Sequence, residues 1–143
     1  MDVSTLLKEL NETCKNTLIE HLGIVFTNVS EGKLVATMPV DQRTTQPMKL
    51  LHGGAILALA ETIGSAGSFI MVDRNKFTVV GMEINANHIG NTTSGLVTGY
   101  GRLLHKGKTT HVWEILVNDQ YGKPVSICRM TNMILEIKEG PAN

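Results

Sequence analysis

The longest apolar segment of the chain, residues 53–72, sets the strongest limit on its fold. Its sequence, GGAILALAETIGSAGSFIMV, is apolar or small almost throughout, and its one charged residue, Glu61, lies near the middle. Such a segment is typical of a membrane-spanning helix or of a helix buried in a protein core. The segment lacks Trp and Tyr, and a carboxylate inside a bilayer is unfavourable by about a few kcal/mol. We therefore predict a fully buried helix, which other backbone approaches closely at its small residues.

The segments before this helix predict a second helix and a hairpin. Apolar residues at spacings of three and four predict an amphipathic helix over Leu6–Leu22 that ends at Gly23. Two β-rich runs, IVFTNV and KLVATMPV, follow it and flank a turn at residues 30–32.

The residues after position 72 predict four more strands. The β-rich runs are FTVVGMEINANHI, GLVTGYGRLLHK, THVWEILVND and PVSICRMTNMILEI. Turn residues separate them at 90–95, 106–108 and 119–122, and we expect each turn to reverse the chain between antiparallel neighbours. The pattern predicts an α+β fold, with about six antiparallel strands curved round one long helix and with an N-terminal helix.

Composition narrows the class of protein. The chain has 143 residues, which suits a single domain. Its 13 basic residues balance its 13 acidic residues, so no overall charge attracts nucleic acid or an anionic membrane. Cys14 and Cys128 lie in no metal-binding motif, which favours reduced, buried thiols, and the N-terminus lacks the apolar core of a secretory signal. We expect a cytoplasmic protein that binds neither nucleic acid nor membrane.

The start of the predicted helix is one candidate site. There the sequence reads Leu51-His52-Gly53-Gly54-Ala55. The first N–H groups of a helix lack intrahelical partners, and the helix dipole is positive at this end, so it binds an anion or polarises a carbonyl. Two glycines leave the backbone open to a ligand. A tight loop-to-helix turn is the alternative interpretation.

Glu61 is the second candidate. An unpaired buried carboxylate is unfavourable, so Glu61 is expected to be paired, to face solvent in a cleft, or to serve catalysis. The positions three and four residues away hold Leu57, Ala58, Gly64 and Ser65, so no ion pair forms along the helix. Seven residues separate Gly54 from Glu61, or roughly 10 Å along a helix on nearly the same face. A two-fold dimer would bring the Gly54 of one chain to the Glu61 of the other.

These residues resemble a known family. The string QPMKLLHGGAILALAETIGSAGS, followed by VVGMEINANHI, resembles the hotdog-fold acyl-CoA thioesterases. The similar group includes the phenylacetate-pathway, enterobactin-proofreading and 1,4-dihydroxy-2-naphthoyl-CoA thioesterases. The resemblance covers roughly residues 22–137 and implies one hotdog domain for residues 1–143. It also implies a homodimer with composite active sites and a homotetramer made of two dimers.

The resemblance assigns catalytic roles residue by residue. Glu61 matches the catalytic carboxylate, which is either the nucleophile or the general base for water. Gly54 matches the residue whose N–H polarises the thioester carbonyl. Gln46 and His52 match polar residues beside the thioester and its departing sulfur, and Ser65 matches a hydroxyl that orients water or the acyl group.

Further positions match the channel for the coenzyme A arm. They are Gly81, His88, Ile89, Gly90, Asn91, His105, Lys106, Gly107, Lys108, Thr109 and Thr110. Lys106 and Lys108 are candidates for binding phosphates, although without the resemblance LHKGKT is typical of an ordinary hairpin turn. Close relatives often carry a basic residue after the position of Ile89, whereas this chain has Gly90, so we expect redistributed phosphate contacts.

The resulting prediction is an acyl-CoA thioesterase for aromatic or medium-chain substrates, with 1,4-dihydroxy-2-naphthoyl-CoA as one candidate. It needs no metal or separate cofactor, since coenzyme A is part of the substrate. The main alternative is a non-catalytic acyl-CoA or lipid-binding module of the same fold, which would be expected to lack or block the carboxylate that Glu61 provides. A hotdog dehydratase would require an Asp and His pair that the helix region does not contain.

Overall fold

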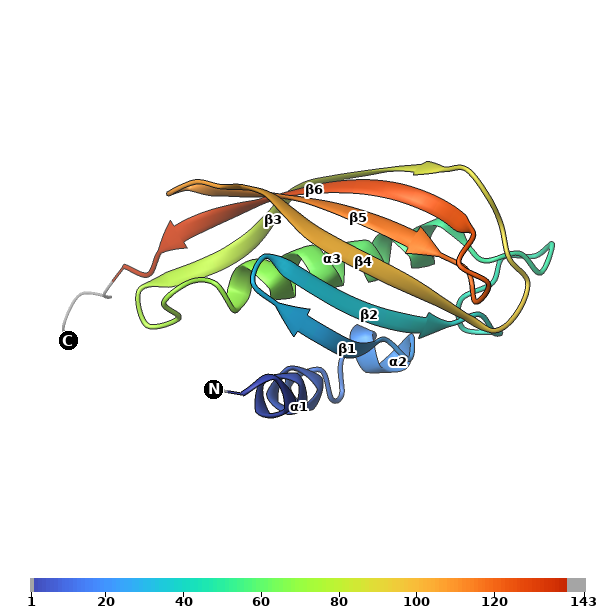
Figure 1. The fold of residues 1–143 in the computed structure, drawn as a ribbon, viewed down its shortest axis with the longest axis horizontal. Helices are drawn as coiled ribbons and strands as arrows, with labels where there is room; N and C mark the ends of the chain where they lie inside the picture. Colours follow the sequence, from blue (N-terminus) through green and yellow to red (C-terminus); the bar gives the residue numbers. More distant parts are fainter. Residues whose placement is uncertain (1, 139–143) are drawn as a thin grey trace.

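A computed structural model describes residues 2–138 and contains one antiparallel six-stranded sheet with a helix along its concave face (Figure 1). The strands lie in the order β1-β2-β4-β5-β6-β3. The elements are α1 (Val3–Thr13), α2 (Leu18–His21), β1 (Val25–Ser30), β2 (Lys33–Pro39), α3 (Gly53–Phe69), β3 (Phe77–His88), β4 (Leu96–Lys106), β5 (Thr110–Asn118) and β6 (Pro124–Glu136). The predicted α+β hotdog fold is thus confirmed.

The N-terminal helix is not continuous, so that part of the prediction is wrong. The chain turns at Asn16, whose φ of 60° is left-handed, and α2 then begins after Thr17, whose hydroxyl accepts a hydrogen bond from the N–H of Ile19. Helical spacing persists across the break because both helices turn apolar residues toward the same core. Gly23, with a φ of 70°, follows α2 as predicted.

The two edges of the sheet differ. At β1, the side chain of Asn11 accepts a hydrogen bond from the N–H of Phe26 at 2.9 Å and donates one to its carbonyl at 3.0 Å. Helix α1 therefore covers part of this edge. Strand β3 forms the other edge, and beyond β6 it has no neighbouring strand within residues 2–138.

The connection at residues 90–95 is not a reversal between neighbours, which corrects the prediction. Strand β3 pairs with β6, whereas β4 pairs with β2 and β5, so the chain crosses from an edge of the sheet to its middle. The turns at 106–108 and 119–122 do join neighbouring strands, as predicted. Turn residues mark where the chain bends, but the pairing of the strands depends on distant segments.

Small residues let α3 approach the sheet closely, as predicted. A Cβ atom on Gly99 or Gly101 of β4 would lie 2.5 or 2.4 Å from Ile63 of α3. A Cβ atom on Gly67 would lie 2.6 Å from the ring of Trp113. The spacing between helix and sheet therefore depends on glycines from both layers.

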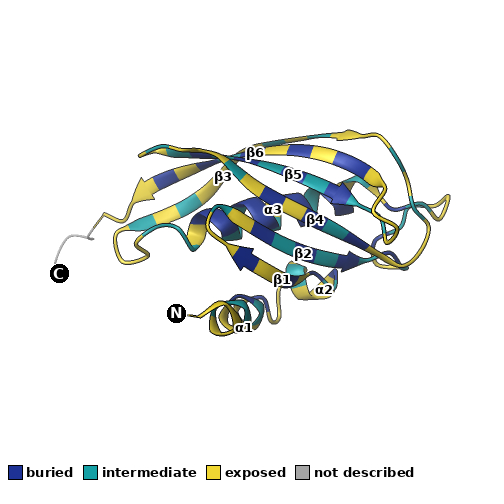
Figure 2. Ribbon diagram, in the orientation of Figure 1, coloured by how far each residue is buried: buried dark blue, intermediate teal, exposed yellow. Residues whose placement is uncertain are grey.

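Helix α3 is not buried all round, contrary to the prediction. Its buried residues, which face the sheet, are Ala55, Ile56, Leu59, Ala60, Ile63, Gly64, Gly67 and Ser68 (Figure 2). Gly54 and Glu61 are exposed on the opposite side, and Leu57, Ala58 and Ser65 there are half-buried. We call these five residues the open stripe of α3. No helix within residues 2–138 is long and apolar enough to cross a bilayer.

We expect Gly101→Ala to lower the free energy of unfolding by about 1–3 kcal/mol, because its Cβ would overlap Ile63 and approach the carbonyl of Leu34 at 3.1 Å. Urea denaturation measures this change. The control is Gly54→Ala, whose Cβ would meet only the exposed His52 ring and should change stability by less than about 0.5 kcal/mol. Equal stability of Gly101→Ala and the wild type would show that this contact does not limit the packing.

Candidate active site

His52 organises the start of α3. Its backbone N–H donates to the carbonyl of Thr44 at 2.8 Å, and its Nδ1 accepts a hydrogen bond from the N–H of Gly54 at 2.7 Å. Because Nδ1 is an acceptor, the ring carries its proton on Nε2, and the residue is exposed. The N–H that the resemblance assigns to the thioester is therefore already hydrogen-bonded. The N–H of Gly53 has no partner within residues 2–138.

His88 covers the same helix start. A Cβ atom on Gly53 would lie 2.7 Å from Nε2 of His88, so the ring sits directly over this glycine. His88 Nδ1 lies 3.1 Å from the hydroxyl oxygen of Ser126, which donates to the carbonyl of Asn87 at 3.2 Å. Ser126 thus orients the His88 ring over the helix. His88, a predicted coenzyme-binding residue, thus lies beside Gly53. Gly53 belongs to the HGG motif, but no role was predicted for it from the sequence.

Gln46 lies on the loop before α3. This loop closes through a bridge between Thr45 and Leu51 and a hydrogen bond from the N–H of Gln46 to the carbonyl of Leu50 at 2.8 Å. The side-chain oxygen of Gln46 accepts a hydrogen bond from the N–H of Met48. The Gln46 amide nitrogen has no hydrogen-bond partner within residues 2–138, so it remains available as a donor.

Glu61 lies on the open stripe, beside strand β3. A Cβ atom on Gly81 would lie 3.1 Å from Oε1 of Glu61 and 3.2 Å from the methyl group of Met130. The strand register shifts between Gly81 and Glu83, so β3 is bulged where it passes the carboxylate. Among residues 2–138, no Lys, Arg or His forms an ion pair with Glu61. Glu61 therefore takes no part in a structural ion pair within the described residues.

A hollow of about 350 Å³ adjoins Glu61. Its lining combines apolar residues of α2 and the following turn with the outer side of α3: Leu18, Ile19, Leu22, Ile24, Ala58, Glu61, Thr62 and Ser65. The Ser65 hydroxyl contacts the sulfur of Met130 at 4.0 Å. Sequence reasoning placed Ser65 beside Glu61 but missed the contribution of α2. The helical spacing of Leu18 and Leu22 is present in the sequence, but spacing alone does not indicate that these residues line the hollow beside Glu61.

Gly81 lies beside Glu61, and the other predicted coenzyme-binding residues fall in two turns at opposite ends of α3. In the turn at 88–91, the N–H groups of Ile89 and Gly90 both donate to the carbonyl of Val125, at 2.9 and 3.1 Å, and Asn91 is exposed. This turn follows His88, at the N-terminal end of the helix.

The β4–β5 turn lies at the other end of α3 (Figure 1). The N–H of Gly107 donates to the carbonyl of Thr110 at 2.8 Å and closes the turn, and His105, Lys106, Lys108 and Thr109 are exposed. Residues 106–109 line a cavity with Met71 and Val72, which follow the C-terminus of α3. The helix has 17 residues and is about 25 Å long, so one chain does not bring the two predicted coenzyme-binding segments together.

Both cysteines lie in the described part of the chain. Cys14 and Cys128 are free and buried, as predicted, and burial raises the pKa of both thiols. Within residues 2–138, no three His, Cys, Asp or Glu side chains are grouped as they would be in a metal site.

The six-stranded sheet wrapped round one long helix is the hotdog fold, and Glu61 lies two turns beyond the start of that helix. The thioesterase superfamily matches residues 48–125, and the chain belongs to this family. The chain is 46% identical over 129 residues to the proofreading thioesterase EntH of Klebsiella pneumoniae, covering 90% of this chain and 93% of EntH.

Two solved structures are similar over nearly the whole chain. A glutamine-to-alanine mutant of thioesterase PA1618 from Pseudomonas aeruginosa has a TM-score of 0.90 and 44% identity, covering 92% of this chain and 94% of that one. Thioesterase HI1161 from Haemophilus influenzae also has a TM-score of 0.90, with 39% identity and coverage of 95% and 94%. The chain is accordingly a hydrolase that acts on thioesters, and the predicted family is confirmed.

Proposed function

We propose that the chain hydrolyses an aromatic or medium-chain acyl-CoA to the free acid and coenzyme A, with 1,4-dihydroxy-2-naphthoyl-CoA as one candidate. The observation that carries this proposal is the unpaired, exposed carboxylate of Glu61 on the same side of α3 as the open helix start. Membership of the thioesterase superfamily favours hydrolysis over the alternative of a non-catalytic binding module.

The active site is composite in this proposal. Within one chain, Gly54 and Glu61 are about 10 Å apart along the helix, too far to act on one carbonyl carbon. Two antiparallel copies of α3 that cross near Leu57 and Ala58, midway between them, would set the Gly54 of one copy opposite the Glu61 of the other. The open stripe supplies the uncovered helix surface that such a crossing requires.

The free edge of the sheet supports the same two-fold arrangement. Strand β3 has 12 residues, and its exposed side chains include Val80 at 46% and Met82 at 57%. A long edge strand with apolar side chains is a template for pairing with another strand. Antiparallel pairing of two β3 strands would bring the 105–110 turn of one copy toward the His88 end of the other. The two coenzyme-binding segments would then meet, one from each chain, and the predicted tetramer would add a second such dimer.

The catalytic steps follow from the hydrogen-bonding capacity of each group. The thioester oxygen accepts a hydrogen bond from the free N–H of Gly53, and from that of Gly54 when His52 turns away. Glu61 either attacks the carbonyl carbon or takes a proton from a water that attacks it. A C–O bond to the carbonyl carbon forms, the C–S bond breaks, and the sulfur leaves as a thiolate near the donor groups of His52 and Gln46. On the direct route the acyl group is then joined to Glu61 as an anhydride, which water cleaves to the free acid and the regenerated carboxylate. Single-turnover hydrolysis in heavy-oxygen water separates the two routes, since only direct attack by Glu61 labels its carboxylate.

The apolar hollow beside Glu61 is the proposed site of the acyl group. Its apolar walls match an aromatic ring or a chain of moderate length, while Thr62 and Ser65 offer hydroxyls to a polar substituent. Lys106 and Lys108 of the second copy are the proposed partners of the coenzyme phosphates.

A panel of CoA esters tests the proposal. We expect benzoyl-, 1,4-dihydroxy-2-naphthoyl- and octanoyl-CoA to be hydrolysed with kcat/KM at least about tenfold above palmitoyl-CoA, because the hollow of about 350 Å³ is too short for a long chain. Release of free thiol, measured with a chromogenic thiol reagent, gives the rates. Preference for palmitoyl-CoA would contradict the assignment of the acyl group, and tight binding of every ester without hydrolysis would favour the non-catalytic module.

A further inference from the structure

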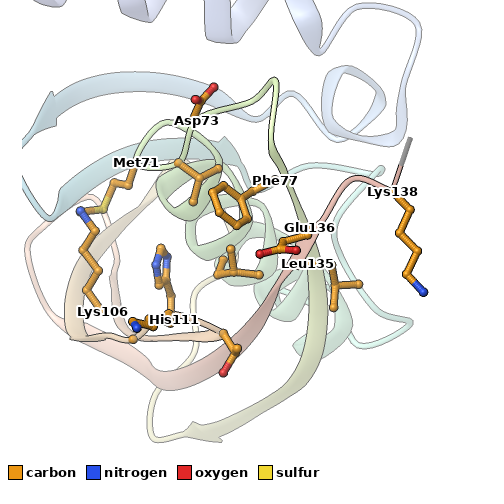
Figure 3. A pocket seen from close by; sticks show the side chains of 13 residues that line it. Met71, Asp73, Phe77, Lys106, His111, Leu135, Glu136 and Lys138 are labelled. Atoms are coloured by element: carbon orange, nitrogen blue, oxygen red, sulfur yellow. The ribbon is translucent and has the colours of Figure 1, made fainter. Parts of the chain in front are cut away.

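A second large cavity lies at the C-terminal end of α3, away from Glu61 (Figure 3). It measures about 900 Å³. Its lining residues come from the loop after α3, the β4–β5 turn and the end of β6. Met71, Val72, Phe77 and Ile134 supply apolar surface, and His111 projects into the cavity from β5.

His111 belongs to a hydrogen-bonded cluster in the core, which settles its tautomer. The indole N–H of Trp113 and the amide nitrogen of Asn132 both donate to the Ser68 hydroxyl oxygen at 2.9 Å, and neither group can accept. These two bonds use both lone pairs of the hydroxyl oxygen. The Ser68 proton must then be donated to Nδ1 of His111, which lies 3.1 Å away. His111 is therefore neutral, with its proton on Nε2.

The Nε2–H of His111 is a donor that the protein leaves unused. His111 is only 2% exposed, yet its Nε2 has no hydrogen-bond partner within residues 2–138. Burial first, and then the positive charge of Lys106, lowers the pKa of His111. Both effects favour the neutral ring that the hydrogen bond from Ser68 requires. Nε2 itself is not fully buried, so this donor faces the cavity, where it is available to a ligand or to water.

Charge at the cavity favours an anion. Lys106 and His111 are partners across strands β4 and β5, and the positive charge of Lys106 acts on the His111 ring. Lys106, Lys108 and Lys138 line the cavity and form no ion pair within residues 2–138. Of the two acidic residues in the lining, Asp73 is already 3.6 Å from Lys76.

We propose that this cavity, at the far end of α3 from the helix start and lined by the same turn that the proposed function assigns to the coenzyme, binds an apolar monocarboxylate. The carboxylate accepts a hydrogen bond from Nε2 of His111 beside the ammonium of Lys106, and the hydrocarbon occupies the apolar wall. A carboxylate fits because it accepts from both donors and carries the matching charge. The site lies in the size range of pockets for small organic ligands.

Calorimetric titration with sodium octanoate tests this site on the whole protein. We expect His111→Asn to weaken binding by about tenfold or more, because the asparagine oxygen replaces Nδ1 as the acceptor for Ser68 while the Nε2 donor is lost. Val72→Trp should abolish binding independently, by filling the cavity from a half-buried loop position. The Val72→Trp variant still tests the proposal if His111→Asn does not fold.

Controls separate this site from the proposed catalytic site. His21→Asn makes the same change at an exposed histidine, and Glu61→Ala alters the other site; neither should weaken octanoate binding at the cavity. Octylammonium, matched in length but cationic, should bind at least about tenfold more weakly. Unchanged octanoate affinity in both cavity variants, or no octanoate binding to the wild type, would overturn the proposal. Because the titration needs no turnover, its result stands apart from the outcome of the thioesterase assays.

Discussion

Glu61→Ala is expected to lower kcat/KM for acyl-CoA hydrolysis by about 10²- to 10⁴-fold, whether Glu61 acts as a general base or as the nucleophile. Its carboxylate forms no ion pair within residues 2–138 and is exposed on α3, so the variant should unfold within about 0.5 kcal/mol of the wild type. Thiol release measures the rate, and urea denaturation measures the stability.

Glu31→Ala is the matched control. Glu31 is an exposed carboxylate in the turn between β1 and β2. Its removal should leave kcat/KM within about twofold of the wild type, because this turn lies at the opposite edge of the sheet from β3 and away from α3's open stripe. Near-normal turnover by Glu61→Ala would remove Glu61 from the proposed mechanism.

Mixing two inactive variants is expected to restore activity if the site is composite. Gly54→Val would block the approach of a thioester to the helix start, and Glu61→Ala would remove the carboxylate. When equal amounts are dissociated and reassociated, half of the dimers contain one chain of each kind. One of the two sites in each mixed dimer is then intact, so about a quarter of wild-type activity should return.

Activity should return in the mixture because Gly54 and Glu61 are too far apart along one α3 to serve the same site. Each mixed dimer combines an unaltered Gly54 from one chain with an unaltered Glu61 from the other, and it gathers both defects in its second site. Each variant reassociated alone is the control and should stay inactive. A mixture as inactive as its components, in which mass spectrometry shows mixed dimers, would place Gly54 and Glu61 of one site in the same chain.

Much of the architecture was predictable because it rests on local patterns. The β-rich runs at 77–89 and 110–119 predicted strands, which the structure has at Phe77–His88 and Thr110–Asn118, and the HGG motif marked the start of the long helix where the structure has it. The small residues along this helix predicted close approach, which Gly67 shows at Trp113. Each of these features depends on the conformation of a few neighbouring residues, which periodicity and turn chemistry report directly.

The candidate site was predictable in its residues but not in their surroundings. The spacing between the HGG motif and Glu61 placed both on one side of α3, as the structure shows. The same sequence predicted a helix buried on all sides. An apolar residue in a sequence does not indicate whether it packs against the sheet or lies on an uncovered side of the helix. The bond between His52 and Gly54 was equally hidden, since it depends on the rotamer of one side chain.

By itself, the sequence determined the kinds and order of elements, the family, and the residues on which thioester chemistry can rest. Only the tertiary structure decided that β3 lies at an edge of the sheet in residues 2–138, that α3 keeps an open stripe, and that the two predicted coenzyme-binding turns lie at opposite ends of α3. It also brought His111 and Lys106 to the wall of a second cavity. These features arise from pairing between distant segments, and periodicity along the chain carries no record of which strand will be the neighbour.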